Sequence, residues 1–137
     1  MTLLDDLAKR LEQAELGVYT EDAGRNIYTS SLPESPDEAI VIYEYTGLPP
    51  TWSHSSQAPT HESPNAQIVV RSQLYEDARA KAQQAFIAIS VHNWYAPSGI
   101  RYLHIMPAQS PFSIGIDQSG RERVGFNLNI LKETSNG

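Results

Sequence analysis

The segment from Ala39 to Ile89 constrains the fold more than any other part of the chain. Two apolar runs, AIVIYEY and QIVVR, flank a stretch rich in proline, serine and histidine, and the second run leads into an amphipathic helical pattern. Valine, isoleucine and tyrosine favour strands, so we predict strands at residues 39–45 and 67–71. The near-continuous apolar character of the first run predicts a central strand covered on both faces.

Residues 48–65 are predicted to form a loop that projects from the body of the protein. The segment holds several prolines, which lack a backbone donor, together with Trp52, His54 and His61. A loop of this length inside a compact domain is usually either functional or disordered. Trp52 is a candidate interface residue, because exposed aromatics are enriched at interface centres. The alternative is that its side chain folds back onto the sheet.

Two helices are expected. Residues 2–16 carry leucine and alanine at helical spacing, with Thr2 as a possible cap and Gly17 as the left-handed residue after the helix. The second helix is predicted to be capped by Ser72, to place its alanines against a sheet, and to fade near His92 and Asn93. The pair Trp94 and Tyr95, just after it, is expected to pack in the core.

The C-terminal third has the alternation of strands with one buried face. The apolar sets lie at Tyr102–Met106, at Phe112, Ile114 and Ile116, and at Val124, Phe126, Leu128 and Ile130, with a hairpin at residues 117–120. The predicted fold class is therefore α+β. We expect a mostly antiparallel or mixed sheet packed by an N-terminal helix and a central amphipathic helix, with a C-terminal β-hairpin.

Length and composition limit the kinds of protein this can be. The 137 residues predict a single domain over 1–137 with a flexible tail at 133–137. There are no cysteines, so disulfides and thiolate metal sites are excluded. The formal charge of −6 argues against broad binding to a nucleic-acid backbone and is expected to aid solubility. No segment approaches the roughly 20 apolar residues of a membrane span, and the N-terminus is too acidic for a secretory signal.

Histidines are the residues that raise the question of catalysis. His54, His61 and Glu62 suggest a metal, but their spacing matches no zinc motif, and solvated loop histidines are the favoured interpretation. His92 and His104 could act as acid or base, yet neither has a nucleophile pattern nearby, and GxSxG, HExxH, P-loop and GxGxxG motifs are absent. We therefore expect no enzyme, no metal and no cofactor.

Three polar residues complete the candidate interface set of Trp52, His54 and His61. Arg71 ends an apolar strand, so two interpretations stay open: a partly buried side chain paired with a carboxylate, or one that reaches solvent. Asn127 and Asn129 lie on the polar face of the last strand, where they could pair with another chain or face water.

The order of these signals resembles the minor capsid or tail terminator proteins of long-tailed bacteriophages. The residues that carry the resemblance are Asn26-Ile27-Tyr28 with Leu32-Pro33, the run AIVIYEYTG from Ala39, the run QIVVR leading into Tyr75-Glu76-Asp77-Ala78, and Pro111 to Ile130 with Asp117, Gly120-Arg121 and Phe126-Asn127. Together these pieces cover most of residues 26–131.

The resemblance implies a structural role in the virion, at the head–tail junction. Such subunits form a ring, commonly six-fold, that stops growth of the tail tube and docks to the head connector, adaptor or stopper protein. It implies assembly in the host cytoplasm, an interface or lumen role for residues 48–64, DNA that passes without specific binding, and no catalytic residues. The alternatives are another virion component, such as a minor capsid, head completion or baseplate protein, and a small metal-dependent hydrolase that uses His54, His61 or His104.

Overall fold

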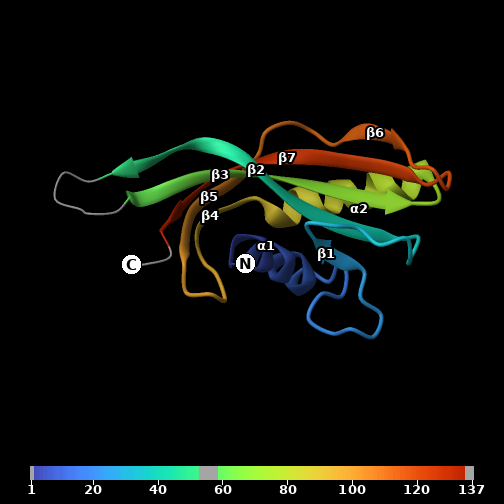
Figure 1. The fold of residues 1–137 in the computed structure, drawn as a ribbon, viewed down its shortest axis with the longest axis horizontal. Helices are drawn as coiled ribbons and strands as arrows, with labels where there is room; N and C mark the ends of the chain where they lie inside the picture. Colours follow the sequence, from blue (N-terminus) through green and yellow to red (C-terminus); the bar gives the residue numbers. More distant parts are fainter. Residues whose placement is uncertain (1, 53–58, 135–137) are drawn as a thin grey trace.

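The structure, a computed structural model, describes residues 2–52 and 59–134. These residues form two helices and a long twisted sheet (Figure 1). The elements are α1 (Thr2–Gln13), β1 (Ile27–Thr29), β2 (Ala39–Trp52), β3 (Pro59–Ser72), α2 (Tyr75–Ile89), β4 (Val91–Tyr95), β5 (Arg101–Pro107), β6 (Phe112–Ile116) and β7 (Glu122–Glu133).

The strands form one mixed sheet of seven strands, which confirms the α+β prediction. Its order is β1-β2-β3-β7-β5-β4, and β6 pairs with β7 beside that path. Only β1 and β2 are parallel; the other pairs are antiparallel. The first half of β7 pairs with β6 and the second half pairs with β5, so two strands pair with β7 along the same edge.

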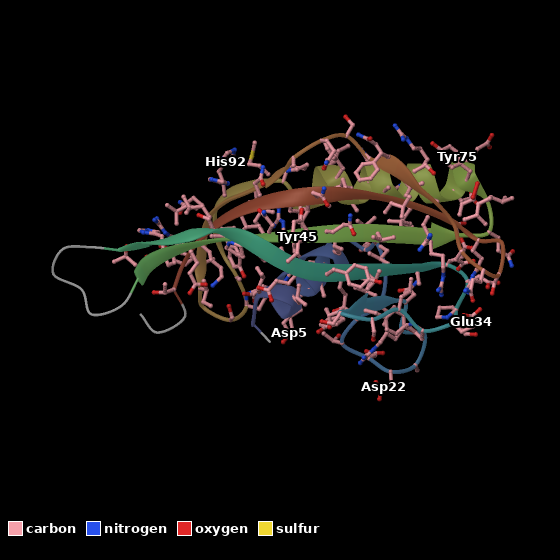
Figure 2. All side chains as sticks on the ribbon, turned by 45° about the horizontal axis from the view of Figure 1, so that its top comes forward. Asp5, Asp22, Glu34, Tyr45, Tyr75 and His92 are labelled. Atoms are coloured by element: carbon pink, nitrogen blue, oxygen red, sulfur yellow. The ribbon has the colours of Figure 1, made fainter. Side chains whose placement is uncertain are left out.

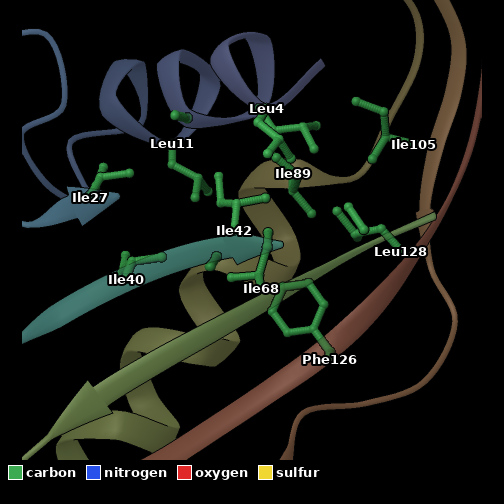
Figure 3. Packing of buried hydrophobic residues seen from close by; sticks show 14 of the residues in the cluster. Leu4, Leu11, Ile27, Ile40, Ile42, Ile68, Ile89, Ile105, Phe126 and Leu128 are labelled. Atoms are coloured by element: carbon green, nitrogen blue, oxygen red, sulfur yellow. The ribbon is translucent and has the colours of Figure 1, made fainter. Parts of the chain in front are cut away.

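Both helices pack against the same face of this sheet, which we call the inner face. Figure 3 shows Leu4 and Leu11 of α1 pointing toward Ile42 of β2. The predicted alanine stripe of α2 is buried, so this helix lies close to the sheet as expected, and Phe86 meets Phe126 of β7 edge to face, with ring centroids 5.6 Å apart. Each fully buried Leu, Ile or Phe side chain contributes roughly 1.5–3 kcal/mol to folding.

The helix ends differ from the predictions. In the turn after α1 the left-handed residue is Glu15, with φ of 64°, and Leu16 N–H bonds the carbonyl of Leu11. Gly17 is needed for another reason, because a Cβ there would lie 2.6 Å from Asn26 Oδ1. The side chain of Thr2 lies outside the described part of the structure.

The second helix is shorter than predicted at both ends. Ser72 ends β3 and donates its hydroxyl to Glu38, so it is not the helix cap, and α2 begins at Tyr75. The helix ends at Ile89, and the next residues form β4. Trp94 packs against the core as expected, whereas Tyr95 is exposed.

The predicted loop at 48–65 is largely strand, and β7 pairs with its β3 side as far as His61. β2 continues to Trp52 and β3 begins at Pro59, and the two strands remain paired as far as Trp52 and Pro59. We call residues 46–52 and 59–64 the hairpin arm. Figure 1 shows this arm extending past both helices at the left of the view. Strand therefore takes the place of the predicted loop at 48–52 and 59–65, and residues 53–58 lie outside the described residues.

The alternation of β6 was also misinterpreted. Phe112 and Ile116 were predicted to face the core, but they are 37% and 61% exposed. A register shift between Ser113 and Gly115 interrupts the strand, and Ile114 lies over Gly125 of β7 on the face away from the helices. Among the described helices, none is long and apolar enough to cross a membrane.

Candidate assembly interface

The sheet face opposite the helices, which we call the outer face, is covered at Val41 and Val69 and is partly exposed from Tyr43 and Gln67 toward the hairpin arm. Because Ile68 and Phe126 point to the core, their neighbours Gln67 and Asn127 point outward. One cross-strand row is Tyr43, Gln67 and Asn127, and the next is Tyr45, Asn65, Asn129 and Met106. Asn127 and Asn129, both predicted from sequence as interface residues, therefore lie side by side on this face.

These two rows of the outer face contain no charged side chain. Gln67 Nε2 donates to Asn127 Oδ1 at 3.1 Å, and Tyr45 and Met106 are 42% and 40% exposed. Burial raises the pKa of Tyr45, which keeps its hydroxyl neutral and able to donate. Beside Asn129, a hollow of about 370 Å³ is lined by Ser63, Asn65, His104 and Leu131. Tyrosine, methionine and amide groups without charge are typical of the centre of a protein interface.

The hairpin arm supplies a second feature that suits assembly. β1 pairs only with Ile40–Ile42 of β2, so from residue 43 to 52 the other edge of β2 has no strand beside it in the described structure. An open edge offers backbone donors and acceptors to another chain. The β3 strand of the arm is held to β7 and the residue after it. Lys132 Nζ lies 3.2 Å from Glu62 Oε2, and Thr134 N–H donates to Thr60 O.

Two of the predicted interface residues, Trp52 and His61, belong to the arm. His61 lies near the far end of the described arm, in register with Thr51 and Glu133, and its Nδ1 is 3.1 Å from Thr60 Oγ1. Trp52 ends β2, with its side chain outside the described part, and His54 lies outside the described residues altogether. The three are thus close in sequence to one structural feature, but the structure gives contacts for His61 alone.

Arg71 lies at the opposite end of β3, about 33 Å from His61 at the usual rise of about 3.3 Å per residue. Its side chain is buried, and it donates to the backbone carbonyls of Glu34 (3.4 Å), Pro36 and Asp37 (3.2 Å). Neither interpretation of its side chain is correct, because it is buried yet bonded to carbonyls rather than to a carboxylate. Burial lowers the pKa of Arg71, and the neighbouring charge of Arg121 lowers it further.

Arg121 is the charged centre of the same end of the molecule. It is buried and forms ion pairs with Asp117 (2.9 Å), Glu34 (3.0 Å) and Asp37 (3.3 Å). Burial opposes its charge, but the carboxylates of Asp117 and Glu34 outweigh that effect and raise the pKa of Arg121. The loop at residues 34–38 is thereby tied to the β6–β7 hairpin. Figure 2 shows Glu34 on this loop, far from the arm.

Sequence reasoning missed Arg121 and Arg123 as residues of a site. The available signal was the triplet Arg-Glu-Arg directly after Gly120, because alternation in a strand places both arginines on one face. The predicted site residues do not converge on one pocket. Those that the structure describes are spread over β2, β3 and β7, from Trp52 in the arm to Arg71 at the opposite end of the sheet. Among residues 2–52 and 59–134, no three histidine or acidic side chains are arranged to hold a metal ion.

Comparison with known proteins identifies the family. A family model described as bacteriophage tail terminator protein matches residues 10–134. Nine chains of solved structures match, among them one from the virion of a native gene transfer agent (GTA) particle. That chain superposes with a TM-score of 0.63 at 13% identity, over 96% of this chain and 95% of the other, a likeness that shows a shared fold. A search of curated proteins finds no match. The chain belongs to the bacteriophage tail terminator family and is a structural, tail-associated protein of the virion.

Proposed function

We propose that this chain is the subunit of a closed homo-oligomeric ring, a hexamer, that caps the tail tube and docks to the head connector, adaptor or stopper protein. The observation that carries the proposal is the hairpin arm, which extends beyond the helices with one open edge along β2. A subunit with a projecting element at one place and a different receiving surface elsewhere makes heterologous contacts, which close into a ring when the rotation is right.

The uncharged outer face supports the same proposal. In a protein of net charge −6, the rows through Asn127 and Asn129 offer amide, tyrosine and methionine side chains to a partner without charge repulsion. We assign this face to contact with the tail tube or a neighbouring subunit. DNA that passes through the ring would meet an acidic protein, so it is expected to move without being bound.

A shortened arm tests the proposal. Tyr45 and Asn65 are register partners, so residues 46–64, which include the whole hairpin arm, can be replaced by an Asn-Gly turn. Lys132→Gln in both the shortened and the full-length protein removes the charge that Glu62 balances. The core should fold unchanged by circular dichroism, while sedimentation velocity and mass photometry should show loss of the ring. A ring with the same number of subunits in the shortened variant would contradict the role of the arm. A protein that stays monomeric alone and also with purified tail tubes would contradict the ring itself.

A further inference from the structure

Three arginines line one hollow on the outer face. Arg71 of β3, Arg121 and Arg123 of β7 surround a space of about 420 Å³, which we call the arginine hollow. Its other walls come from the loop that carries Glu34 and from the β6–β7 hairpin at Asp117. The hollow lies at the end of the sheet opposite to the hairpin arm, because Arg71 and His61 are at the two ends of β3.

Two of these arginines face each other across neighbouring strands. Arg71 and Arg123 are register partners on β3 and β7, and like charges placed directly opposite in a sheet are destabilising. Arg71 is partly compensated by the three carbonyl oxygens that it binds. Arg121 is compensated by three carboxylates.

Arg123 has no such compensation. Its one hydrogen bond runs from Nε to the carbonyl of Gly115, at 3.4 Å, and no carboxylate of the described residues lies within ion-pair distance of its guanidinium. The two terminal nitrogens of a guanidinium form a fork that fits a carboxylate with two parallel hydrogen bonds. Arg123 therefore presents an unused anion-binding fork to the arginine hollow.

We propose that the arginine hollow receives a carboxylate side chain from a neighbouring copy of this chain, held by the fork of Arg123 with the charge of Arg71 behind it. The inference rests on the proposed ring. It adds a specific electrostatic contact between subunits, at the end of the sheet away from the arm. One surface of each subunit would then donate an acidic residue, and a different surface would receive one.

Charge complementarity within the chain favours this occupant. Acidic residues exceed basic ones by 16 to 10. Several exposed carboxylates have neither an ion pair nor a side-chain hydrogen bond in the described part of the chain: Glu15, Glu21, Glu44, Glu76 and Asp77. A nucleic-acid backbone fits less well, because the walls of the hollow already carry Glu34 and Asp117, which a row of phosphates would meet.

The test compares Arg123→Gln with Arg79→Gln. Each variant loses one positive charge and has an amide N–H donor in place of the guanidinium. Arg79, however, is exposed on α2 and lies outside the hollow. Sedimentation velocity over a wide concentration range, at low and high salt, gives the dissociation constant of self-association. We expect Arg123→Gln to raise it by about tenfold or more and to reduce its salt dependence, and Arg79→Gln to leave it unchanged.

Two further measurements keep the outcomes separate. Arg123→Lys retains the charge without the fork, so an intermediate dissociation constant is expected. If Arg123→Gln assembles like the unmodified protein, the carboxylate contact is wrong while the ring stands. If the unmodified protein does not self-associate, either alone or with purified tail tubes, the proposed ring is wrong, and so is the contact that depends on it. Fluorescence anisotropy with duplex DNA checks the other anion: binding that depends on Arg123 would overturn the assignment to a carboxylate.

Discussion

Tyr102 and Asp6 are hydrogen-bonded inside the protein, 96 residues apart in sequence. The tyrosine hydroxyl donates to Asp6 Oδ2 at 2.9 Å, and both side chains are fully buried. Ser98 Oγ donates to the same oxygen at 2.7 Å. This carboxylate therefore fastens α1 to β5 and to the turn between β4 and β5, and it does so within the core on the inner face.

Replacing Tyr102 with Phe should lower the free energy of unfolding by about 1.5–3 kcal/mol, because Asp6 loses the buried one of its two side-chain donors. Urea denaturation of the two proteins measures the difference. The matched control is Tyr95→Phe, since Tyr95 is 67% exposed and its variant should be neutral. An equal loss in both variants would show that the bond to Asp6 contributes nothing.

The same tyrosine predicts a loss of stability in alkali. Burial, followed by the charge of Asp6, raises the pKa of Tyr102 above the ordinary value of about 10. A raised pKa stabilises the fold below the ordinary value, and that contribution disappears as the pH rises through the folded-state pKa. Stability measured above about pH 10 should fall more steeply for the unmodified protein than for Tyr102→Phe.

Asp117 should affect stability in acid. The backbone N–H of Arg121 bonds its carboxylate, and this bond lowers the pKa of Asp117. A lowered pKa gives a contribution that is present above the ordinary aspartate pKa of about 3.9 and lost as the pH falls below it. Asp117→Asn should thus be less stable than the unmodified protein at neutral pH, with a difference that shrinks in acid. Asp22→Asn is the control, because the Asp22 side chain is 99% exposed.

Gly125 should tolerate no larger residue. A Cβ at this position would lie 2.6 Å from the carbonyl oxygen of Ile68 and 2.8 Å from Ile114 Cδ1. Gly125→Ala is expected to cost about 1–3 kcal/mol by overpacking, measured as a fall in the denaturation midpoint. Adding Ile114→Ala should recover only part of the loss, because the backbone oxygen remains. Full recovery would locate the conflict in the side chain alone.

The outer face can be probed with a single charge. Asn129 is exposed beside Asn65 and Met106, so Asn129→Arg should change the free energy of unfolding by less than about 1 kcal/mol while it weakens assembly. Gln83→Arg places the same charge on the exposed side of α2 and serves as the control. Assembly that is equally strong in both variants would remove the outer face from the interface.

The parts of the fold that follow from periodicity were predicted well. Phe126 and Leu128 alternate with Asn127 and Asn129 on a strand that is covered by helices on one side only, so the pattern of β7 translates directly into burial. β6 carries a similar pattern, but it is short and interrupted at Gly115, and no helix covers Ile116. Alternation shows that a strand has two faces; it cannot show which face will be covered.

The hairpin arm and the arginine hollow were beyond sequence reasoning for different reasons. Prolines predict a loop because they lack a backbone donor. Pro49 and Pro50, however, lie between Leu48 and Thr51, where the register with β3 shifts and the other edge of β2 is open. Strands accept proline at such positions. The hollow depends on Arg71 and Arg123 being in register across 52 positions of chain, and no local pattern contains that pairing.

The hairpin arm also links the stability of one subunit to its neighbours. The arm extends past both helices, so no helix layer backs its strands, although β7 pairs with β3 as far as His61. In the proposed ring, a neighbour would supply that missing layer and cover surface that a lone subunit leaves in water. Each subunit would then gain stability as the next one arrives.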